Sequence, residues 1–440
     1  MASLPSSLSS LLFLTLALIL ISVSPALSTS RQALDDHQDQ PMKTGFKVTL
    51  NNVDSGGSFT ERLLQATTRS NRRLQHFNKM VSNANNSNFR SGVYPADGAY
   101  FMNFSIGTPP KSYYGIMDTG SDLIWTQCRP CLCFSQPSPV FDPKTSSSYS
   151  NLSCSSDLCQ NLESICNDGC EYIYGYGGGT IIFGYLATET FTIGGVSLPK
   201  IGFGCTIFTF DGEGFGDGLV GLGRGPLSLI SQLDEPKFSY CLTSWEGTKN
   251  STLVVGPQAS VNLTAGAGAF NTTPLLLNPL IPTFYYVSLE GITIGGTKLP
   301  IPNTTFALNP DGLGGVIVDS GTTITFLEFN AYILVREQFI SQVQLPLVDA
   351  FNETGLDLCF KVPSDPFSVQ FPSLVFQFQN ASLNFPTANY IIGDSRIACL
   401  AMAPSFGFSI FGNILQQNML LVYDLSNNTL SFQPTKCDKF

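Results

Sequence analysis

The sequence contains very little histidine. Only two histidines occur in 440 residues, and both of them, His37 and His76, lie near the N-terminus. If that region is removed on maturation, the working protein has no imidazole. Hydrolases whose serine or cysteine is activated by a histidine base are then disfavoured, as are zinc sites built on histidine.

Charged side chains are also scarce. They make up 12% of the residues, against 43% for hydrophobic ones, which predicts a substantial core and argues against disorder. The formal charge of −10 makes the surface acidic, and such a surface repels phosphate, so we expect no nucleic-acid partner. The acidic residues are scattered and form no loop of alternating ligands, so neither a metal site nor a cofactor is expected.

Long hydrophobic runs are missing except at the N-terminus. Leu11–Val23 is almost wholly apolar, and small residues follow at Ala26–Ser28. This pattern predicts a signal peptide over residues 1–28. A membrane anchor is the alternative, but the apolar run is short for a bilayer span. We therefore expect a secreted monomer with no membrane span after signal cleavage, located outside the cell in the apoplast or, alternatively, in the vacuole.

The segment 29–90 differs in charge from the rest of the chain. It holds nine basic residues against five acidic ones, although the whole chain is acidic. Within it, Phe59–Val81 has the periodicity of an amphipathic helix. A basic helical segment ahead of an acidic body predicts a propeptide that is held by charge and released in acid. A flexible N-terminal tail is the alternative.

From Gly92 onward the chain shows short β-like runs separated by glycine, proline, asparagine and serine. This spacing predicts an all-β protein with sandwich-like or barrel-like lobes. Two helices are also expected, over Leu227–Leu233 and Glu328–Gln342. The clearest strand candidates are Tyr100–Ile106, Thr190–Ile193, Phe284–Leu289, Val316–Val318 and Leu420–Tyr423.

One short motif occurs twice. Residues 116–121 read Ile-Met-Asp-Thr-Gly-Ser, and residues 317–322 read Ile-Val-Asp-Ser-Gly-Thr. Each copy is followed later by two apolar residues and a glycine, at 219–221 and at 410–412. The pattern predicts a duplicated unit with one such loop in each half of the chain.

Two loops of this kind would bring two carboxylates together, those of Asp118 and Asp319. Each apolar strand carries its aspartate to the end of a β-element, and the glycine that follows allows a tight loop. The nearby hydroxyl groups can bond the carboxylates or tie one loop to the other. The expected supporting residues are Thr119, Gly120, Ser121, Ser320, Gly321 and Thr322. Two close carboxylates share one proton, so one can activate water while the other polarises a carbonyl.

The motif over Asp118–Cys128 and the cysteine-rich insert that follows it resemble the pepsin-like aspartic proteases, and more closely the plant nepenthesin-type group. The resemblance covers about residues 99–437. It implies a bilobal fold, with two β-barrel-like lobes related by a pseudo-twofold axis and a cleft between them. The N-terminal lobe would span 91–276, with the insert at 129–170, and the C-terminal lobe would span 277–440.

The resemblance also implies an activity. It is that of an aspartic endopeptidase, made as a zymogen, which hydrolyses internal peptide bonds at acid pH. A water molecule held between Asp118 and Asp319 would attack the scissile carbonyl without a covalent intermediate. The expected partners are therefore protein or peptide substrates.

The family carries a tyrosine on a β-hairpin flap that covers the site. Position matching assigns this role to Tyr176, with Trp125 as its hydrogen-bond partner, and Tyr174 is the competitor if the register is off by two. Gly177 and Gly178 would complete the substrate-binding part of the flap. Alternatively, either tyrosine is only a side chain of a strand that packs over the core and has no role in the site.

The flap tip departs from the group's usual pattern. The group has aspartate and serine where this chain has Gly178 and Thr180. The run of glycines predicts a more flexible tip and the loss of polar contacts to the substrate backbone, which affects rate and specificity but not the type of reaction.

Twelve cysteines behind a signal peptide indicate six disulfides. The spacing of Cys128 and Cys131 is also that of half a zinc site, but no second pair matches it. The resemblance implies the pairs Cys128–Cys131, Cys133–Cys205, Cys154–Cys170, Cys159–Cys166, Cys241–Cys437 and Cys359–Cys399.

Glycosylation sequons support the secretory route. Asn103 lies in a strand-like run and is the one expected to stay unmodified. The expected sites are Asn151, Asn250, Asn262, Asn271, Asn303, Asn352, Asn380 and Asn427.

Two other functions compete with the protease. One is a non-catalytic inhibitor or binding protein on the same fold, against which the intact Asp118 and Asp319 argue. The other is a glycosidase with paired carboxylates, which would not need two duplicated loops.

Overall fold

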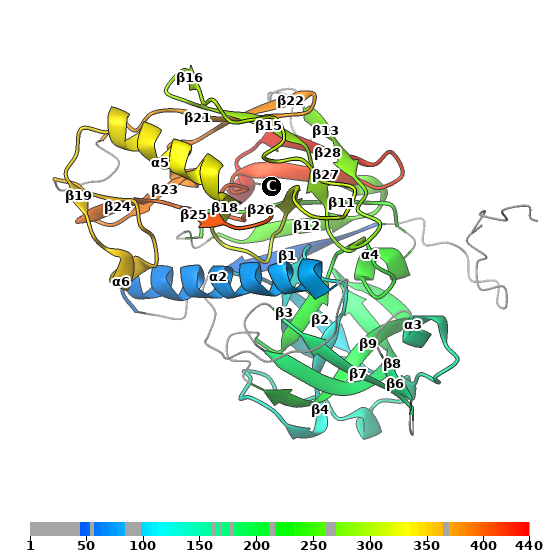
Figure 1. Cartoon of the computed structure of the whole chain (residues 1–440). Coiled ribbons are helices and arrows are strands. Elements are labelled where there is room, and N and C mark those ends of the chain that lie inside the picture. The colour runs from blue at the N-terminus through cyan, green and yellow to red at the C-terminus, as the bar shows by residue number, and fades with distance from the viewer. Residues whose placement is uncertain are drawn as a thin grey trace, which may run out of the picture. The chain divides into compact units, whose positions relative to one another are not determined.

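The chain from Lys43 to Phe440 forms one compact unit. The predicted signal peptide and His37 lie outside the residues that the structure describes. The computed structural model (Figure 1) describes residues 45–52, 57–83, 98–160, 164–166, 169–176, 180–210, 216–233, 235–245, 247, 249–260, 270–363 and 369–439.

Most of the described elements are strands, which confirms the prediction of an all-β fold. The strands up to residue 276 are β1 (Phe46–Asn52), β2 (Tyr100–Ile106), β3 (Lys111–Asp118), β4 (Trp125–Leu132), β5 (Ser150–Asn151), β6 (Ser164–Cys166), β7 (Cys170–Gly175), β8 (Ile181–Ile193), β9 (Val196–Phe210), β10 (Gly218–Gly221), β11 (Lys237–Cys241), β12 (Ser251–Val255) and β13 (Asn271–Leu276). We refer to residues 45–83 as the N-terminal segment, to residues 98–276 as the N-terminal half and to residues 277–439 as the C-terminal half.

The strands of the C-terminal half are β14 (Tyr286–Val287), β15 (Leu289–Ile294), β16 (Thr297–Lys298), β17 (Val316–Val318), β18 (Thr325–Glu328), β19 (Leu347–Val348), β20 (Cys359–Lys361), β21 (Leu374–Phe378), β22 (Ala381–Phe385), β23 (Ile391–Gly393), β24 (Ile397–Leu400), β25 (Met402–Ser405), β26 (Ser409–Phe411), β27 (Met419–Asp424) and β28 (Thr429–Pro434). The α-helices are α2 (Phe59–Asn83), α3 (Asp157–Gln160), α4 (Leu229–Gln232), α5 (Phe329–Gln342) and α6 (Phe351–Thr354). The 3₁₀ helices are η1 (Pro143–Thr145), η2 (Pro257–Ser260), η4 (Thr387–Asn389) and η5 (Cys437–Lys439).

The two copies of the repeated motif lie on the same kind of strand pair. β3 ends at Asp118 and runs parallel to β10, with Asp118 opposite Gly221. β17 ends one residue before Asp319 and runs parallel to β26, with Val318 opposite Phe411. Each element of two apolar residues and a glycine therefore lies beside the strand that carries an aspartate, which is how the duplication positions both acids.

The two halves of the chain share a sheet. β11 pairs antiparallel with β27, and β13 pairs antiparallel with β28. In the first of these pairs the rings of Phe238 and Tyr423 stack with their centroids 4.4 Å apart. This shared sheet lets a contact in one half fix a position in the other.

Helix α2 is part of the hydrophobic core. Its side chains Leu63, Leu74 and Phe77 are buried in one cluster with residues of the C-terminal half such as Phe284 and Phe408. The predicted helix over 59–81 agrees closely with α2, and Figure 1 shows it as one continuous blue helix. In this structure, then, the helix is docked on the body.

Strand β1 was not expected from the sequence. Phe46, Val48 and Leu50 are buried, whereas Lys47 and Thr49 between them are exposed, as in a strand with one buried face. β1 pairs antiparallel with β12 on one side and with β2 on the other. The N-terminal segment therefore contributes a paired inner strand to the main sheet.

The disulfides agree with expectation in the C-terminal half and differ from it in the insert. Cys241–Cys437 and Cys359–Cys399 are present as expected. The other expected pairs, Cys128–Cys131, Cys133–Cys205, Cys154–Cys170 and Cys159–Cys166, are wrong. The structure instead has Cys128–Cys205, Cys131–Cys133, Cys154–Cys166 and Cys159–Cys170.

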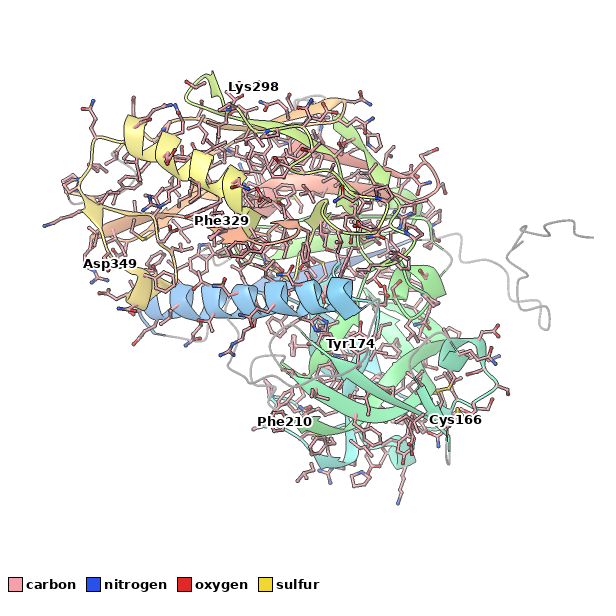
Figure 2. All side chains as sticks on the ribbon, in the orientation of Figure 1. Cys166, Tyr174, Phe210, Lys298, Phe329 and Asp349 are labelled. Atoms are coloured by element: carbon pink, nitrogen blue, oxygen red, sulfur yellow. A yellow bond between two sulfur atoms is a disulfide. The ribbon has the colours of Figure 1, made fainter. Side chains whose placement is uncertain are left out.

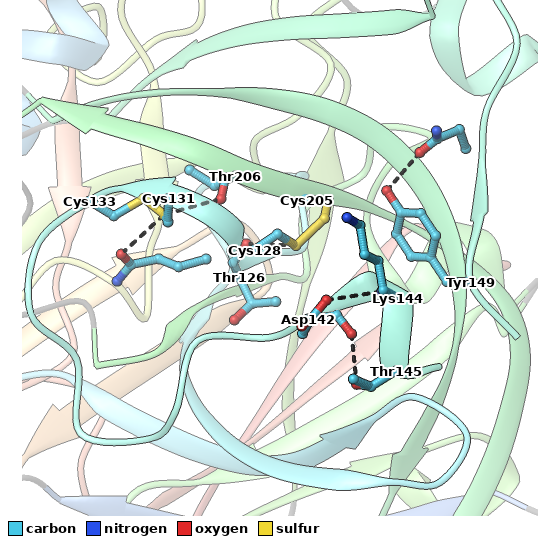
Figure 3. Close-up of a disulfide and its surroundings, with 12 residues drawn as sticks. Thr126, Cys128, Cys131, Cys133, Asp142, Lys144, Thr145, Tyr149, Cys205 and Thr206 are labelled. Carbon is cyan, nitrogen blue, oxygen red and sulfur yellow. Dashed lines mark hydrogen bonds between the residues drawn. A yellow bond between two sulfur atoms is a disulfide. The ribbon is translucent and has the colours of Figure 1, made fainter. Parts of the chain in front are cut away.

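Strand register explains part of this difference. β4 and β9 run parallel with Thr126 opposite Cys205, so Cys128 lies close to Cys205 (Figure 3). In the β6–β7 hairpin, Cys166 and Cys170 are direct partners across the strands, and each bonds to a cysteine that precedes the hairpin. Sequence spacing does not reveal either register.

Most of the expected glycosylation sites are accessible. Asn103 belongs to β2, as expected, but its side chain is exposed, so strand position alone gives no reason for it to stay unmodified. Asn271 is partly buried, and Asn262 lies outside the described residues. The exposed ones are Asn151, Asn250, Asn303, Asn352, Asn380 and Asn427. In the part of the chain that the structure describes, none of the helices has the length and apolar character needed to cross a membrane.

Candidate active site

The first loop surrounds the carboxylate of Asp118 with donors. Asp118 is fully buried at the end of β3. Gly120 N donates to its Oδ1 over 3.0 Å, and Ser121 Oγ donates to its Oδ2. These bonds fix the plane of the carboxylate.

The second loop repeats this arrangement around Asp319, which is also fully buried. Gly321 N donates to Asp319 Oδ1 over 2.8 Å, and Thr322 Oγ1 donates to Oδ2. Corresponding atoms of the two motifs thus make corresponding bonds, as a duplicated unit predicts.

The middle hydroxyl residues tie the loops to each other. Thr119 N donates to Ser320 Oγ over 3.1 Å, and Ser320 N donates to Thr119 Oγ1 over 2.9 Å. Each hydroxyl then donates to the backbone of the opposite strand, Thr119 to Val318 O and Ser320 to Met117 O. This reciprocal contact fixes the distance between the two aspartate loops.

The glycines show how closely the carboxylates approach. A Cβ atom on Gly120 would lie 2.7 Å from Asp319 Oδ1, and one on Gly321 would collide with Asp118 Oδ1. A side chain at either position would therefore separate the loops or displace a carboxylate.

Arg73 of α2 binds both aspartates at once. Its Nη2 donates to Asp118 Oδ1 and, over 3.1 Å, to Asp319 Oδ1, while its Nε donates to Asp319 Oδ2 over 2.5 Å. The side chain is almost fully buried, and its guanidinium also lies over the ring of Phe77. Since one nitrogen bonds both carboxylates, the two acids face a common point, and the arginine occupies it.

The charges in this cluster oppose the effect of burial. Burial lowers the pKa of Arg73, but the charges of Asp118 and Asp319 outweigh it and raise that pKa. Burial raises the pKa of Asp319. The charge of Arg73 opposes this rise, and the charge of Asp118 adds to it. An arginine stays charged under these conditions, so acid weakens this ion pair by protonating Asp319.

The tyrosines of β7 and the segment after it also reach the site. Tyr176 is buried against Trp125, with ring centroids 6.0 Å apart, and Tyr174 lies 4.9 Å from Tyr176. Burial raises the pKa of Tyr176, and a hydrogen bond with Trp125 acts in the opposite direction. The structure therefore places Tyr176 beside its expected partner, whereas Gly177 and Gly178 lie outside the described residues.

Tyr174 lies close to the first aspartate loop. Figure 2 shows it on β7 beside one end of α2. Burial raises its pKa most, followed by the charges of Asp122 and Asp118, and it has a hydrogen bond with the backbone of Asp122. Both tyrosines considered from the sequence thus lie near the aspartates, Tyr176 against Trp125 and Tyr174 beside the loop that carries Asp118.

Sequence reasoning missed two residues of this site. Arg73 is one of four arginines in α2, and the helical pattern gave no sign of which one would meet the aspartates. Asp122 follows directly on the first motif, but its carboxylate bonds depend on segments far away in the sequence.

Two family models match the chain. "Xylanase inhibitor N-terminal" matches residues 100–257, and "Xylanase inhibitor C-terminal" matches residues 284–434. Among curated proteins, the chain is 49% identical to aspartic proteinase nepenthesin-1 of Nepenthes gracilis, over 98% of this chain and 99% of the relative. It is 47% identical to nepenthesin-2 of the same plant, over 96% and 97%.

Solved structures show the same fold at much lower identity. The crystal structure of edgp matches with a TM-score of 0.67 and 17% identity, over 91% of this chain and 97% of that one. Basic 7S globulin from soybean matches with a TM-score of 0.62 and 16% identity, over 90% and 99%. At this identity the likeness concerns the fold alone.

Proposed function

The chain belongs to the nepenthesin-type aspartic proteases, and on that premise we propose that it is a secreted aspartic endopeptidase, made as a zymogen, that cleaves internal peptide bonds at acid pH. The enzyme class follows from the relatives, which are aspartic proteinases over nearly the whole chain. The observation that carries the proposal is the pair of matching loops around Asp118 and Asp319, whose carboxylates converge on one nitrogen of Arg73.

The chemistry follows from that convergence. Once Arg73 has left, two buried carboxylates at this separation cannot both ionise, so they share one proton. The ionised member accepts a proton from a water molecule placed between them, and the oxygen of that water attacks the scissile carbonyl carbon. The protonated member donates to the carbonyl oxygen. The tetrahedral species then collapses, with a proton passing to the leaving amine, and no bond to the enzyme forms.

The zymogen part of the proposal is supported by the docking of the N-terminal segment. Arg73 holds the position where the water would lie, and it does so from a helix packed into the core. Ser70 Oγ accepts from Thr323 N over 3.0 Å, and Arg69 Nη2 donates to Thr323 Oγ1 over 2.8 Å, just beyond the second loop. A substrate cannot reach the aspartates while α2 lies there.

The secretory part is supported by sequence and chemistry together. Six disulfides are present, which are stable in oxidising compartments, and most of the predicted glycosylation sites are exposed. The predicted signal peptide would direct the chain to the extracellular space, with the vacuole as the alternative destination.

The test uses the full chain, incubated in acid with a denatured protein as substrate. We expect the substrate to be digested at internal bonds. Asp118→Asn and Asp319→Asn should each lower the rate by at least about a thousandfold, because the shared proton and the activated water need both acids. Asp438→Asn, a change to an exposed aspartate, is the matched control.

The competing function is a non-catalytic inhibitor. It is favoured by the names of the two matching family models, which refer to xylanase inhibitors. The same preparation is therefore tested for inhibition of a microbial xylanase. Inhibition by a chain that digests nothing after acid treatment would replace the protease with this alternative.

A further inference from the structure

A further contact between the two halves lies one residue beyond the first catalytic motif. Asp122 follows Ser121, and its two carboxylate oxygens accept from different segments. Gly225 N donates to Oδ1 over 2.8 Å, and Thr283 Oγ1 donates to Oδ2 over 2.7 Å. Gly225 lies between β10 and α4, whereas Thr283 lies in the C-terminal half, ahead of β14.

Further hydrogen bonds connect this contact to the backbone of the catalytic aspartate. Arg224 N donates to Thr283 O over 3.0 Å, and Tyr285 Oη donates to Leu222 O over 2.7 Å. Leu222 N in turn donates to Asp118 O over 2.8 Å. A continuous chain of hydrogen bonds therefore leads from the C-terminal half to the backbone of Asp118.

Glycines make room for the carboxylate of Asp122. A Cβ atom on Gly223 or Gly225 would collide with its oxygens, and one on Gly221 would collide with its backbone. The turn after β10 is thus shaped around this one acidic side chain, which is more than an incidental surface contact would require.

We propose that Asp122 is a positioning residue for peptide hydrolysis: with Thr283 and Gly225 it braces the C-terminal half against the first catalytic loop and so holds Asp118 in register with Asp319. The inference rests on the proposed function. The shared sheet of β11, β13, β27 and β28 joins the halves away from the aspartates, and the bonds between Thr119 and Ser320 join the two loops themselves. The contact of Asp122 adds a link directly beside the first loop, where small displacements of reacting groups are costly to rate.

The hydrogen bond between Asp122 and Thr283 can persist at the acid pH at which the proposed enzyme works. Burial raises the pKa of Asp122 to about 6; its hydrogen bonds oppose this, and Asp118 adds to it. The side chain is therefore neutral in acid. A threonine hydroxyl can accept as well as donate, so the Thr283 bond persists when Asp122 carries a proton. Tyr174 and Tyr285 are further titratable groups whose pKa values respond to the Asp122 charge, and neither is ionised in acid.

The test measures kcat and KM for one peptide substrate with the acid-treated full chain. Thr283→Val removes the hydroxyl at nearly constant volume, and Asp122→Ala removes the carboxyl. We expect each to lower kcat by about tenfold and to change KM by less than about twofold, because the geometry of Asp118 is disturbed while substrate contacts remain. Thr293→Val removes a half-buried hydroxyl that bonds Gln377 away from the site, and is the control.

Conservative variants separate positioning from folding. Thr283→Ser restores the hydroxyl, and Asp122→Asn can still accept from Gly225 and donate to Thr283, so both should recover most of the lost kcat. Thermal unfolding at the assay pH shows whether each variant is folded. Values of kcat within about twofold of the parent in Thr283→Val and Asp122→Ala would overturn the brace, as would losses that the conservative variants do not recover. An inactive parent would instead overturn the proposed function, and this inference with it.

Discussion

Arg73 is buried, charged and shared between two acids, so its removal has consequences that removal of a surface arginine would not have. In Arg73→Gln the carboxylates lose their cation, and breaking a buried ion pair typically costs about 3 kcal/mol or more. We expect the full chain of this variant to process itself at least about tenfold faster in mildly acidic solution, as followed by gel electrophoresis over time. The matched control is Arg336→Gln on α5, which breaks a partly exposed pair with Asp357. Equal processing rates for Arg73→Gln and the parent would mean that the ion pair does not restrain the enzyme.

Single residues also show what the sequence could predict. Asp118, Asp319 and their hydroxyl neighbours could be assigned from the sequence. The residues that form the motif are six consecutive ones, and the motif occurs twice. The roles of Arg73 and Asp122 could not be assigned in this way, because each depends on which distant segment packs against it. A local motif predicts its own hydrogen bonds, whereas a buried ion pair depends on tertiary packing.

At the level of elements, regular patterns were predicted well and register was not. The expected helices over 59–81 and 328–342 agree with α2 and α5 within two residues at either end. β1 was missed although its side chains alternate, because its partners, β2 and β12, lie far away in the sequence. The cysteine pairs of the insert were wrong for a related reason, since they follow from strand register.

The flap gives a prediction at this scale. The tip predicted from the sequence has three glycines, at 177–179, and the group has aspartate at the position of Gly178. Gly178→Asp restores a carboxylate that can bond the substrate backbone, and it reduces backbone freedom. We expect a change of about threefold or more in KM, or in the preference among several peptides, with folding stability little affected.

Steady-state kinetics on a set of peptides checks this expectation. Ser197→Asp adds the same charge at an exposed position near the other end of the β8–β9 hairpin and is the control. If kinetic constants for Gly178→Asp match those of the parent for every peptide, the tip makes no polar contact that matters.

For the whole molecule, the spacing of short β-like runs predicted an all-β fold. The duplicated motif predicted a duplicated unit, because both the aspartate loop and its downstream apolar element recur. The chain's formal charge of −10 also suggested that a basic N-terminal segment is held by charge. The structure adds that the central ion pair is buried, so bulk salt screens it little. Salt therefore weakens attractions between surface charges, whereas the buried ion pair responds to pH and little to salt.

This difference predicts how the N-terminal segment is released. Burial raises the pKa of Asp319 most, Arg73 opposes that rise, and Asp118 reinforces it. Loss of the Arg73 charge on release of α2 therefore favours the protonated form of Asp319. Release therefore takes up protons and is favoured as pH falls. We expect amides of α2 to stay protected from hydrogen exchange at neutral pH in both about 0.1 M and about 1 M NaCl, and to lose protection in acid. Loss of protection in high salt at neutral pH would show that surface charge, not the buried pair, holds the helix.

The disulfide between Cys241 and Cys437 has one more consequence for an enzyme of this kind. A protease at high concentration is surrounded by copies of itself, and its own exposed loops are among the first bonds that it meets. Because Cys437 lies close to the end of the chain and is joined to the middle of it, any single cut between the two cysteines leaves both fragments covalently attached. A molecule cut once in this range therefore stays in one piece, with both aspartates in the same covalently linked molecule. It can remain folded and active after a single cut by another copy of the enzyme.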